Sequence, residues 1–392
     1  MSNKPQFVGK RVKLGELISK AKVERCGGRS FPVYSMTMHD GIVEQSGRFK
    51  KAIASKDTSA YKVVKKNQLV VGFPIDEGVI YVQNHDQPGI MSPAYNVWDF
   101  DSSRIIPAYL ELTLHSPQSM AYYAEKLRGT TARRRSLTAE GLRALPINLP
   151  SIECQRTVVE VLNGIKDQIA AAQKATEELD SLVKSQFVEM FGDPVDGTLW
   201  TRRRLSDLYE VKSSKRVYAR ELTEGGVPFL RLADIGSLID SGMHTSGLFI
   251  SEEKYNSLKE RGNVPAPGDV LVTARGTLGR CYVIETSDRF YFQDGMITWL
   301  AAGEQSPLPR YLLSVFDDHH FIENLNRNCS GTTVKYLSIS DLSNVAIPVP
   351  PLELQCRFTD FAALVDKSKL IAQQQIEKLQ TLYDSLAQEY FS

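Results

Sequence analysis

The chain has 392 residues, which is enough for two or three domains with sizeable hydrophobic cores. Its 47 Lys and Arg residues almost balance its 46 Asp and Glu residues, and the resulting net charge of +1 argues against a uniformly basic nucleic-acid-binding protein. No apolar run approaches the ~20 residues that span a membrane, and the first residues lack the apolar core of a signal peptide, so we expect a cytoplasmic protein without membrane contact.

The first 150 residues are predicted to fold as an α+β domain, which we call the first head. Apolar runs at 69–73 and 79–82 flank a short turn rich in Pro, Asp and Gly, and this pattern predicts two strands joined as a hairpin. Helical segments are expected around 107–128, and the apolar stretch 145–150 is typical of a strand.

Residues 151–191 are predicted to form one long helix. Apolar residues recur at alternating steps of four and three, the pattern of a coiled-coil seam, over roughly 41 residues. The seam includes Val158, Leu162, Ile165, Ile169, Leu179 and Val183. Pro150 marks the start of the helix, and the turn at 191–197 ends it.

Residues 192–350 form the second head and 351–392 the second long helix. The second head contains strand-like runs at 270–273 and 281–284 around an Arg-Gly-Thr-Leu-Gly turn, with helical segments around 309–328. The helix repeats the seam with Phe358, Ala362, Val365, Ala372, Ile376, Leu379, Tyr383, Leu386 and Tyr390, and Lys369 is its one polar interruption.

The two halves repeat one another. A shift of 200 residues superposes Leu142 on Leu342, Pro150 on Pro350 and Gln155 on Gln355, and a shift of 202 superposes the Gly-Thr-Thr run at 129–131 on the run at 331–333. Between the N-terminal parts of the two heads and Pro107 or Pro309, the two copies differ in sequence.

The order of these elements constrains the architecture. The first helix leads directly into the second head, so a second helix that packs on the first must run back along it. The sequence therefore predicts an α+β fold with two similar globular domains at opposite ends of an antiparallel pair of long coiled-coil helices, related by a pseudo-twofold axis. Two similar surfaces at a fixed separation suit a bipartite linear target such as DNA, and the different interiors predict two different half-targets.

The near-neutral total charge conceals an uneven distribution. The first head has a net charge of +9, the first helix −3, the second head −3 and the second helix −2, and the second head contains 12 Arg but only 5 Lys. Clustered or turn-flanking cations suit contact with phosphates, and arginine can also recognise guanine. The predicted DNA-binding residues are Lys50, Lys51, Lys62, Lys65, Lys66, Arg133, Arg134, Arg135, Arg231, Arg275, Thr277, Arg280 and Lys335.

Catalytic motifs are lacking. The sequence contains no phosphate-binding P-loop, no zinc-protease motif and no nucleophile elbow. Asp317, Asp318, His319 and His320 could ligate a metal, although a solvated helix face explains them better. The spacing of Asp240, Glu252 and Lys254 could hold Mg²⁺ in a nuclease, a pattern that also arises by chance. We therefore expect no catalytic residue and no bound metal in this chain.

Several segments together resemble one family. They are the Gly-Thr-Thr run, YLSISDL at 336–342, IPVPPLELQ at 347–355, EMFGDP at 189–194 and the two long helices. This combination, over nearly the whole chain, resembles the specificity subunit of type I restriction-modification enzymes, which serve in DNA methylation and phage defence.

The resemblance implies a division of labour between subunits. The two heads would be target recognition domains, each recognising one half of a bipartite site in double-stranded DNA. The helices would set the spacer and bind two copies of the methyltransferase subunit, through Leu162, Ile165, Ile169, Leu179, Val183, Val365, Ile376, Leu379 and Tyr383. S-adenosylmethionine would be bound by that partner, and ATP and Mg²⁺ by a restriction subunit. A coiled-coil adaptor that never contacts DNA is the main alternative, favoured by the low net charge.

Overall fold

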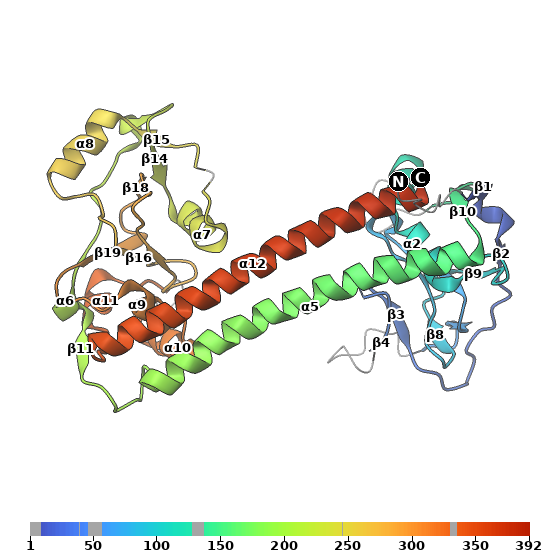
Figure 1. The fold of residues 1–392 in the computed structure, drawn as a ribbon, viewed down its shortest axis with the longest axis horizontal. Coiled ribbons are helices and arrows are strands. Elements are labelled where there is room, and N and C mark those ends of the chain that lie inside the picture. The colour runs from blue at the N-terminus through green and yellow to red at the C-terminus, as the bar shows by residue number, and fades with distance from the viewer. Residues whose placement is uncertain (1–8, 39, 46–56, 128–136, 245, 330–334) are drawn as a thin grey trace, which may run out of the picture. The chain divides into compact units, whose positions relative to one another are not determined.

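A computed structural model describes residues 9–38, 40–45, 57–127, 137–244, 246–329 and 335–392 (Figure 1). The chain forms two compact units. The first unit comprises residues 1–173 and 373–392, and the second comprises residues 174–372. Each unit therefore contains one head together with a segment of each long helix.

The two long helices are α5 (Ile152–Phe191) and α12 (Leu352–Phe391), of 40 residues each, which confirms the prediction. Gly192 ends α5 in the left-handed conformation, with φ of 75°, and the Asp193 side chain accepts the N–H groups of Val195 and Asp196 in the following turn. In the described part of the chain, no helix is both long and apolar enough to cross a membrane.

Both units contain a four-stranded antiparallel sheet with the same strand order. In the first unit the order is β2 (Ile18–Lys20), β9 (Asn96–Phe100), β6 (Leu69–Val71) and β7 (Ile80–Val82). In the second unit it is β12 (Tyr209–Lys212), β19 (Ile297–Ala302), β16 (Val270–Thr273) and β17 (Cys281–Val283). The register also agrees, because Leu69 pairs with Trp98 and Val82, and Val270 correspondingly pairs with Leu300 and Val283. The predicted hairpins are thus confirmed as β6–β7 and β16–β17.

A second antiparallel ladder in each unit pairs the start of the head with its end. These ladders are β1 (Lys10–Lys13) with β10 (Pro146–Leu149), and β11 (Arg202–Arg204) with β20 (Ala346–Pro348). A short helical turn follows the first strand in each case, η1 (Leu14–Glu16) and α6 (Leu205–Leu208). The similar runs LGEL at 14–17 and LSDL at 205–208 therefore lie in a shared structural element.

The helical segments predicted around 107–128 and 309–328 are each divided into two helices. They are α2 (Pro107–Leu114) and α3 (Pro117–Lys126), and α9 (Pro309–Phe316) and α10 (His319–Asn328). Ser116 and Asp318 are the N-caps that begin α3 and α10, and each side chain accepts a backbone N–H of its helix. The sequence periodicity did not reveal these breaks. A short helix, α4 (Ala139–Arg143) or α11 (Ile339–Asn344), precedes the last strand of each head.

The remaining elements differ between the units. The first unit adds two antiparallel strand pairs, β3 (Tyr34–Met36) with β4 (Ile42–Glu44), and β5 (Lys62–Val64) with β8 (Gly89–Met91). The second adds α7 (Leu232–Ser241), α8 (Glu252–Glu260), η4 (Ala219–Glu221) and a sheet of β13 (Leu222–Thr223), β15 (Phe249–Ile250), β14 (Val227–Leu230) and β18 (Tyr291–Phe292). Each unit is thus a common frame with its own additional elements.

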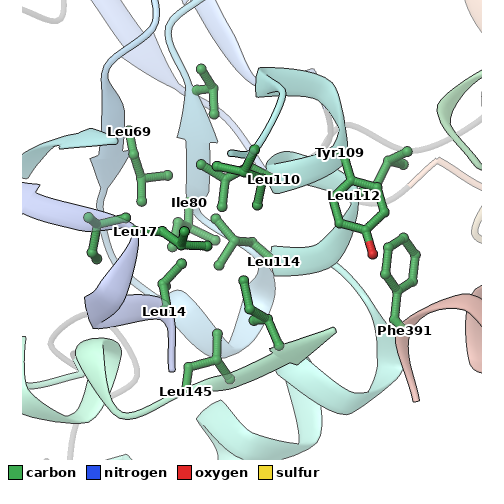
Figure 2. Packing of buried hydrophobic residues seen from close by; sticks show 14 of the residues in the cluster. Leu14, Leu17, Leu69, Ile80, Tyr109, Leu110, Leu112, Leu114, Leu145 and Phe391 are labelled. Atoms are coloured by element: carbon green, nitrogen blue, oxygen red, sulfur yellow. The ribbon is translucent and has the colours of Figure 1, made fainter. Parts of the chain in front are cut away.

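The core of the first unit includes the start of α5 and the end of α12. Val158 and Leu162 from α5 are buried in one cluster with Tyr390 and Phe391 from α12. Figure 2 shows Phe391 beside Tyr109 at the edge of this cluster. Farther along α5, the Lys166 ammonium lies 5.3 Å from the ring centroid of Tyr383, so the two segments run antiparallel.

The core of the second unit contains the opposite ends of the same helices. Phe187 and Phe191 of α5 pack with Phe358 of α12, with ring centroids 5.6 and 5.5 Å apart. Lys369 of α12 is bound to Asp180 of α5, so these segments are also antiparallel. Each unit therefore depends on both helices for its hydrophobic core.

Candidate DNA interface

The predicted basic residues of the first head have different environments. Lys65 is exposed, and Lys66 lies 2.5 Å from a carboxylate oxygen of Asp86. Lys62 is half-buried and donates a hydrogen bond to the Tyr95 carbonyl. Burial, with the nearby charges of Lys20 and Arg25, lowers the pKa of Lys62. Of these three lysines, Lys65 is therefore the best placed to contact a phosphate, because it is exposed whereas Lys66 is paired with Asp86 and Lys62 is half-buried. Lys50, Lys51, Arg133, Arg134, Arg135 and both Gly-Thr-Thr runs lie outside the described residues.

In the second head, two segments that the sequence flagged separately lie against one another. The backbone N–H of Leu337 donates to the Ala274 carbonyl at 3.0 Å, which ties the segment after the Gly-Thr-Thr run to the β16–β17 loop. Next to this bond, the Arg275 guanidinium lies 4.9 Å from the ring centroid of Tyr336. This contact holds an exposed guanidinium over an aromatic face, and sequence reasoning had not singled out Tyr336.

The β16–β17 loop is internally braced. The Thr273 hydroxyl donates to the Thr277 carbonyl at 2.6 Å and accepts the Arg280 N–H at 3.0 Å. Gly276 and Gly279 both have positive φ, and a Cβ on Gly279 would lie only 2.8 Å from the Ile322 side chain. The two glycines therefore have a conformational role, and the exposed residues Arg275 and Thr277 are held in fixed positions.

Arg231 and Lys335 each come directly before a residue that lies against the β16–β17 loop, Leu232 and Tyr336 respectively. Arg231 is exposed at the N-cap of α7, where its N–H donates to Asp234 at 2.8 Å. Leu232 begins α7 and lies near the loop, because a Cβ on Gly276 would be 3.8 Å from its side chain. Lys335 donates to the Asn326 carbonyl at 2.8 Å and remains exposed. Three separate segments thus supply cations near the β16–β17 loop.

Arg280 has a different environment from Arg275. Its guanidinium forms an ion pair with Asp240 at the end of α7. Arg280 also lines a groove of about 890 Å³ together with Arg310, Asp366 and Lys369. A paired arginine is less available for phosphate than an unpaired one, because the carboxylate already neutralises its charge. Arg275 is therefore the stronger candidate for DNA contact.

The acidic residues of the alternative nuclease site do not converge. Asp240 pairs with Arg280, Glu252 with Arg289, and Lys254 with Glu221 at 2.8 Å. Each charge is thus occupied by a different partner, and the arrangement does not provide the shared cation site that the nuclease hypothesis requires.

The Asp and His residues at 317–320 also diverge. Asp317 forms an ion pair with Lys184 at 3.2 Å, Asp318 caps α10, and His320 lies 2.9 Å from Asp193. Among the described residues, no group of three or more His, Cys, Asp or Glu side chains is placed to hold a metal ion. An ion pair, a helix cap and a hydrogen bond therefore account for the positions of Asp317, Asp318 and His320.

The predicted partner-binding residues occupy the seam within each unit. Leu162, Ile165 and Val365 are buried, and Ile169, Leu179, Val183, Ile376, Leu379 and Tyr383 are partly buried. Other apolar side chains on the helices are more exposed, including Leu364 at 67% and Ile371 at 56%. Partner binding through the seam residues stays a prediction, and the exposed helix faces offer more accessible surface.

Comparison with known proteins identifies the chain's relatives. Residues 198–381 match the model of the type I restriction modification DNA specificity domain. A putative type I restriction enzyme specificity subunit of Haemophilus influenzae is 26% identical over 66% of this chain and 64% of its own length. The MjaIX specificity subunit of Methanocaldococcus jannaschii is 24% identical over 70% of this chain and 66% of its own length. The matches thus span slightly less than two thirds of these relatives.

Solved structures agree on the fold. A chain from a type I restriction-modification system, solved to explain complex assembly and conformational transition, aligns with a TM-score of 0.62 at 20% identity, covering 100% of this chain and 98% of that one. The S subunit of a type I system from M. genitalium aligns with a TM-score of 0.54 at 15% identity, with the same coverage. Residues 198–381 therefore match a type I restriction modification DNA specificity domain, and the chain is similar to the specificity subunits of type I restriction-modification enzymes.

Proposed function

We propose that this chain selects the DNA sequence on which a type I restriction-modification complex acts, and that each unit recognises one half of a bipartite site. The observation that carries the proposal is the duplicated sheet, with one strand order and one register, joined to different additional elements in each unit. A repeated frame suits repeated contact with a duplex, while different additional elements suit two different half-sites. The helices would determine the length of the spacer.

The catalytic steps would belong to partner subunits. Two methyltransferase copies would bind S-adenosylmethionine, and a restriction subunit, where present, would bind ATP and Mg²⁺. The helices carry net charges of −3 and −2, which favour protein contact over contact with phosphates. Leu364 and Ile371 lie seven residues apart and are both exposed, so they share one face of α12 on which an apolar partner surface could pack.

Methylome sequencing tests the proposal most directly. Cells that express this chain with its modification subunit are compared with cells that express the modification subunit alone. We expect a bipartite methylated motif with two different half-sites only when this chain is present. A motif that is unchanged by its removal would refute the proposal.

A salt titration distinguishes the DNA-recognition hypothesis from a protein adaptor. Arg133, Arg134 and Arg135 are replaced by alanine, and the affinity of the assembled complex for DNA is measured against salt concentration. Loss of phosphate contacts should reduce the slope of log affinity against log salt by roughly 0.9 for each contact. An adaptor that never contacts DNA would show the same affinity and slope in both proteins.

A further inference from the structure

Lys13 and Arg204 occupy the same structural position in the two units. Lys13 is the last residue of β1 and pairs with Pro146, and Arg204 is the last residue of β11 and pairs with Ala346. Pro146 and Ala346 are 200 residues apart, which is the shift that superposes the ends of the two sequence repeats. The strand register and the sequence repeat therefore give the same equivalence of Lys13 and Arg204.

The backbone next to these two residues is also built in the same way. The N–H of Leu14 donates to the Leu145 carbonyl, and the N–H of Leu205 donates to the Val345 carbonyl, both at 2.8 Å. Leu14 and Leu205 are fully buried, so each fixes the chain directly after the cation of its head. The two cations are therefore held by matching contacts on the common frame.

An acidic residue three positions later completes each segment. Glu16 accepts the N–H of Lys13 at 3.1 Å, and Asp207 accepts the N–H of Arg204 at 3.3 Å. Within the described part of the chain, neither the Lys13 ammonium nor the Arg204 guanidinium forms an ion pair, and both side chains are exposed. Both cations are therefore available to an external anion.

Other cations lie near Lys13. It lines a groove of about 670 Å³ together with Lys20 and Arg143, and the carboxylates that also line this groove are those of Glu16 and Glu140. Lys20 and Arg143 are both exposed. Three cations therefore line the groove with two carboxylates, of which the Glu16 carboxylate is already engaged by the Lys13 N–H. The groove thus has an excess of positive charge.

The surroundings of Arg204 are cationic as well. Arg202 and Arg203 precede it in β11. Their guanidinium groups donate to backbone carbonyl oxygens and to the side-chain amide oxygen of Gln305, all of which are neutral acceptors. These bonds fix the two side chains without neutralising their charge, so this part of the second unit also attracts anions.

The feature that the two positions share indicates the ligand. The two half-sites are expected to differ in base sequence, but both present the same sugar-phosphate backbone. Lysine and arginine both carry a positive charge and differ in hydrogen-bonding geometry, so Lys13 and Arg204 have only the charge in common. Phosphate contacts position a protein on the duplex without carrying sequence information. A cation on the common frame therefore suits the part of the target that both half-sites share.

We propose that Lys13 and Arg204 are equivalent phosphate-binding residues, which place the two units on the DNA backbone in the same way. Base selection is left to the elements that differ between the units. This inference rests on the proposed function, because it names contacts by which the common frame binds the duplex. Neither residue is among the DNA-binding residues predicted from the sequence.

The test uses the full complex with its modification subunit and measures its affinity for duplex DNA against salt concentration. One duplex carries the methylated motif and a second carries an unrelated sequence. Lys13→Gln and Arg204→Gln should each reduce the slope of log affinity against log salt by roughly 0.9, and the double variant by roughly 1.8. The affinity for both duplexes should fall by the same factor, and the methylated motif should stay unchanged.

Two sets of control variants separate a phosphate contact from a structural role. Lys13→Arg and Arg204→Lys keep the charge and should keep the wild-type salt slope. Lys378→Gln and Arg357→Gln each remove one charge from an exposed position on α12. They should leave the slope nearly unchanged, because that helix is acidic and is not expected to contact phosphates.

Four outcomes would overturn the inference. An unchanged salt slope in Lys13→Gln or Arg204→Gln would show that the residue makes no phosphate contact. Less assembled modification subunit with an unchanged slope would indicate that the cation binds an acidic surface of that partner. An altered methylated motif would indicate base recognition, and a lowered melting temperature with an unchanged slope would indicate a structural role. Failure of the wild-type complex to give any bipartite motif would instead contradict the proposed function itself.

Discussion

The ring of Phe391, the residue before the C-terminus, packs against the ring of Tyr109 in the first unit, with centroids 5.5 Å apart (Figure 2). Phe391 is 5% exposed and belongs to the main core cluster of that unit. Asn148 also donates a hydrogen bond to the carbonyl of Tyr390 at 2.9 Å. The last turn of α12 is therefore part of the hydrophobic core of a head that ends more than 200 residues earlier in the chain.

Phe391→Ala should destabilise the first unit by about 3–5 kcal/mol, the usual cost of removing a buried phenylalanine. Unfolding in urea, followed by a probe in each unit, measures the effect. Phe191→Ala should cause a comparable loss in the second unit, where Phe191 is 1% exposed and contacts Tyr311. Leu382→Ala is the control, because that side chain is 47% exposed. Equal losses for Phe391→Ala and Leu382→Ala would contradict the assignment of Phe391 to the core.

Gln155 and Gln355 join each head to its helix through matching hydrogen bonds. Their side-chain oxygens accept the N–H groups of Ile106 and Leu308, at 2.9 and 2.8 Å. Gln155→Leu or Gln355→Leu removes the acceptor of the Ile106 or Leu308 backbone N–H. We expect each change to lower the free energy of unfolding of its own unit by about 1–3 kcal/mol. Thermal unfolding compares them with Gln380→Leu, an exposed site that should change little. Melting temperatures that do not differ from this control would show that the bonds are dispensable.

Lys369 interrupts the apolar seam of α12 and binds Asp180 of α5. The two side chains are 30% and 54% exposed, so solvent screens their attraction, and Asp180→Asn should cost less than about 1 kcal/mol. The loss should shrink further in about 1 M salt, where the screening length is only ~3 Å. Lys369→Ile restores the residue type found at Ile169, the matching seam position, and should not destabilise the protein. A loss of several kcal/mol in either variant, measured by urea unfolding, would contradict this account.

His320 and Asp193 should make stability depend on pH. The hydrogen bond to Asp193 raises the pKa of His320. Burial tends to raise the pKa of Asp193, but hydrogen bonds from His320 and two backbone N–H groups outweigh it and lower that pKa. A raised histidine pKa stabilises the folded state fully below about 6.5, the unfolded pKa, and this contribution is lost as the pH rises through the folded-state pKa. Because the pKa of Asp193 is lowered, its carboxylate stays charged and keeps the ion pair with His320 until the pH becomes strongly acid.

The expected result is a melting temperature difference between wild type and His320→Gln that is largest near pH 5 to 6 and declines toward pH 8. His319→Gln is the matched control, because the His319 ring is 87% exposed and lies 3.9 Å from its nearest carboxylate, Glu323. We expect a smaller pH dependence from that change. A difference for His320→Gln that is constant with pH would mean that His320 contributes only through packing.

The sequence determined the features that follow from local patterns. The seam periodicity predicted two long helices, each observed with 40 residues, and alternating apolar runs predicted the hairpins β6–β7 and β16–β17. The repeat predicted a duplicated frame, although the common four-stranded sheet lies where the two sequences have diverged. Sequence similarity can disappear there because many apolar residues satisfy the same strand pattern.

Only the tertiary structure decided which side chains meet. Composition could not distinguish Arg275, stacked on Tyr336, from Arg280, neutralised by Asp240. Helices and hairpins arise from interactions between near neighbours in the chain, whereas the pairing of charges and the completion of each core depend on residues brought together from distant segments.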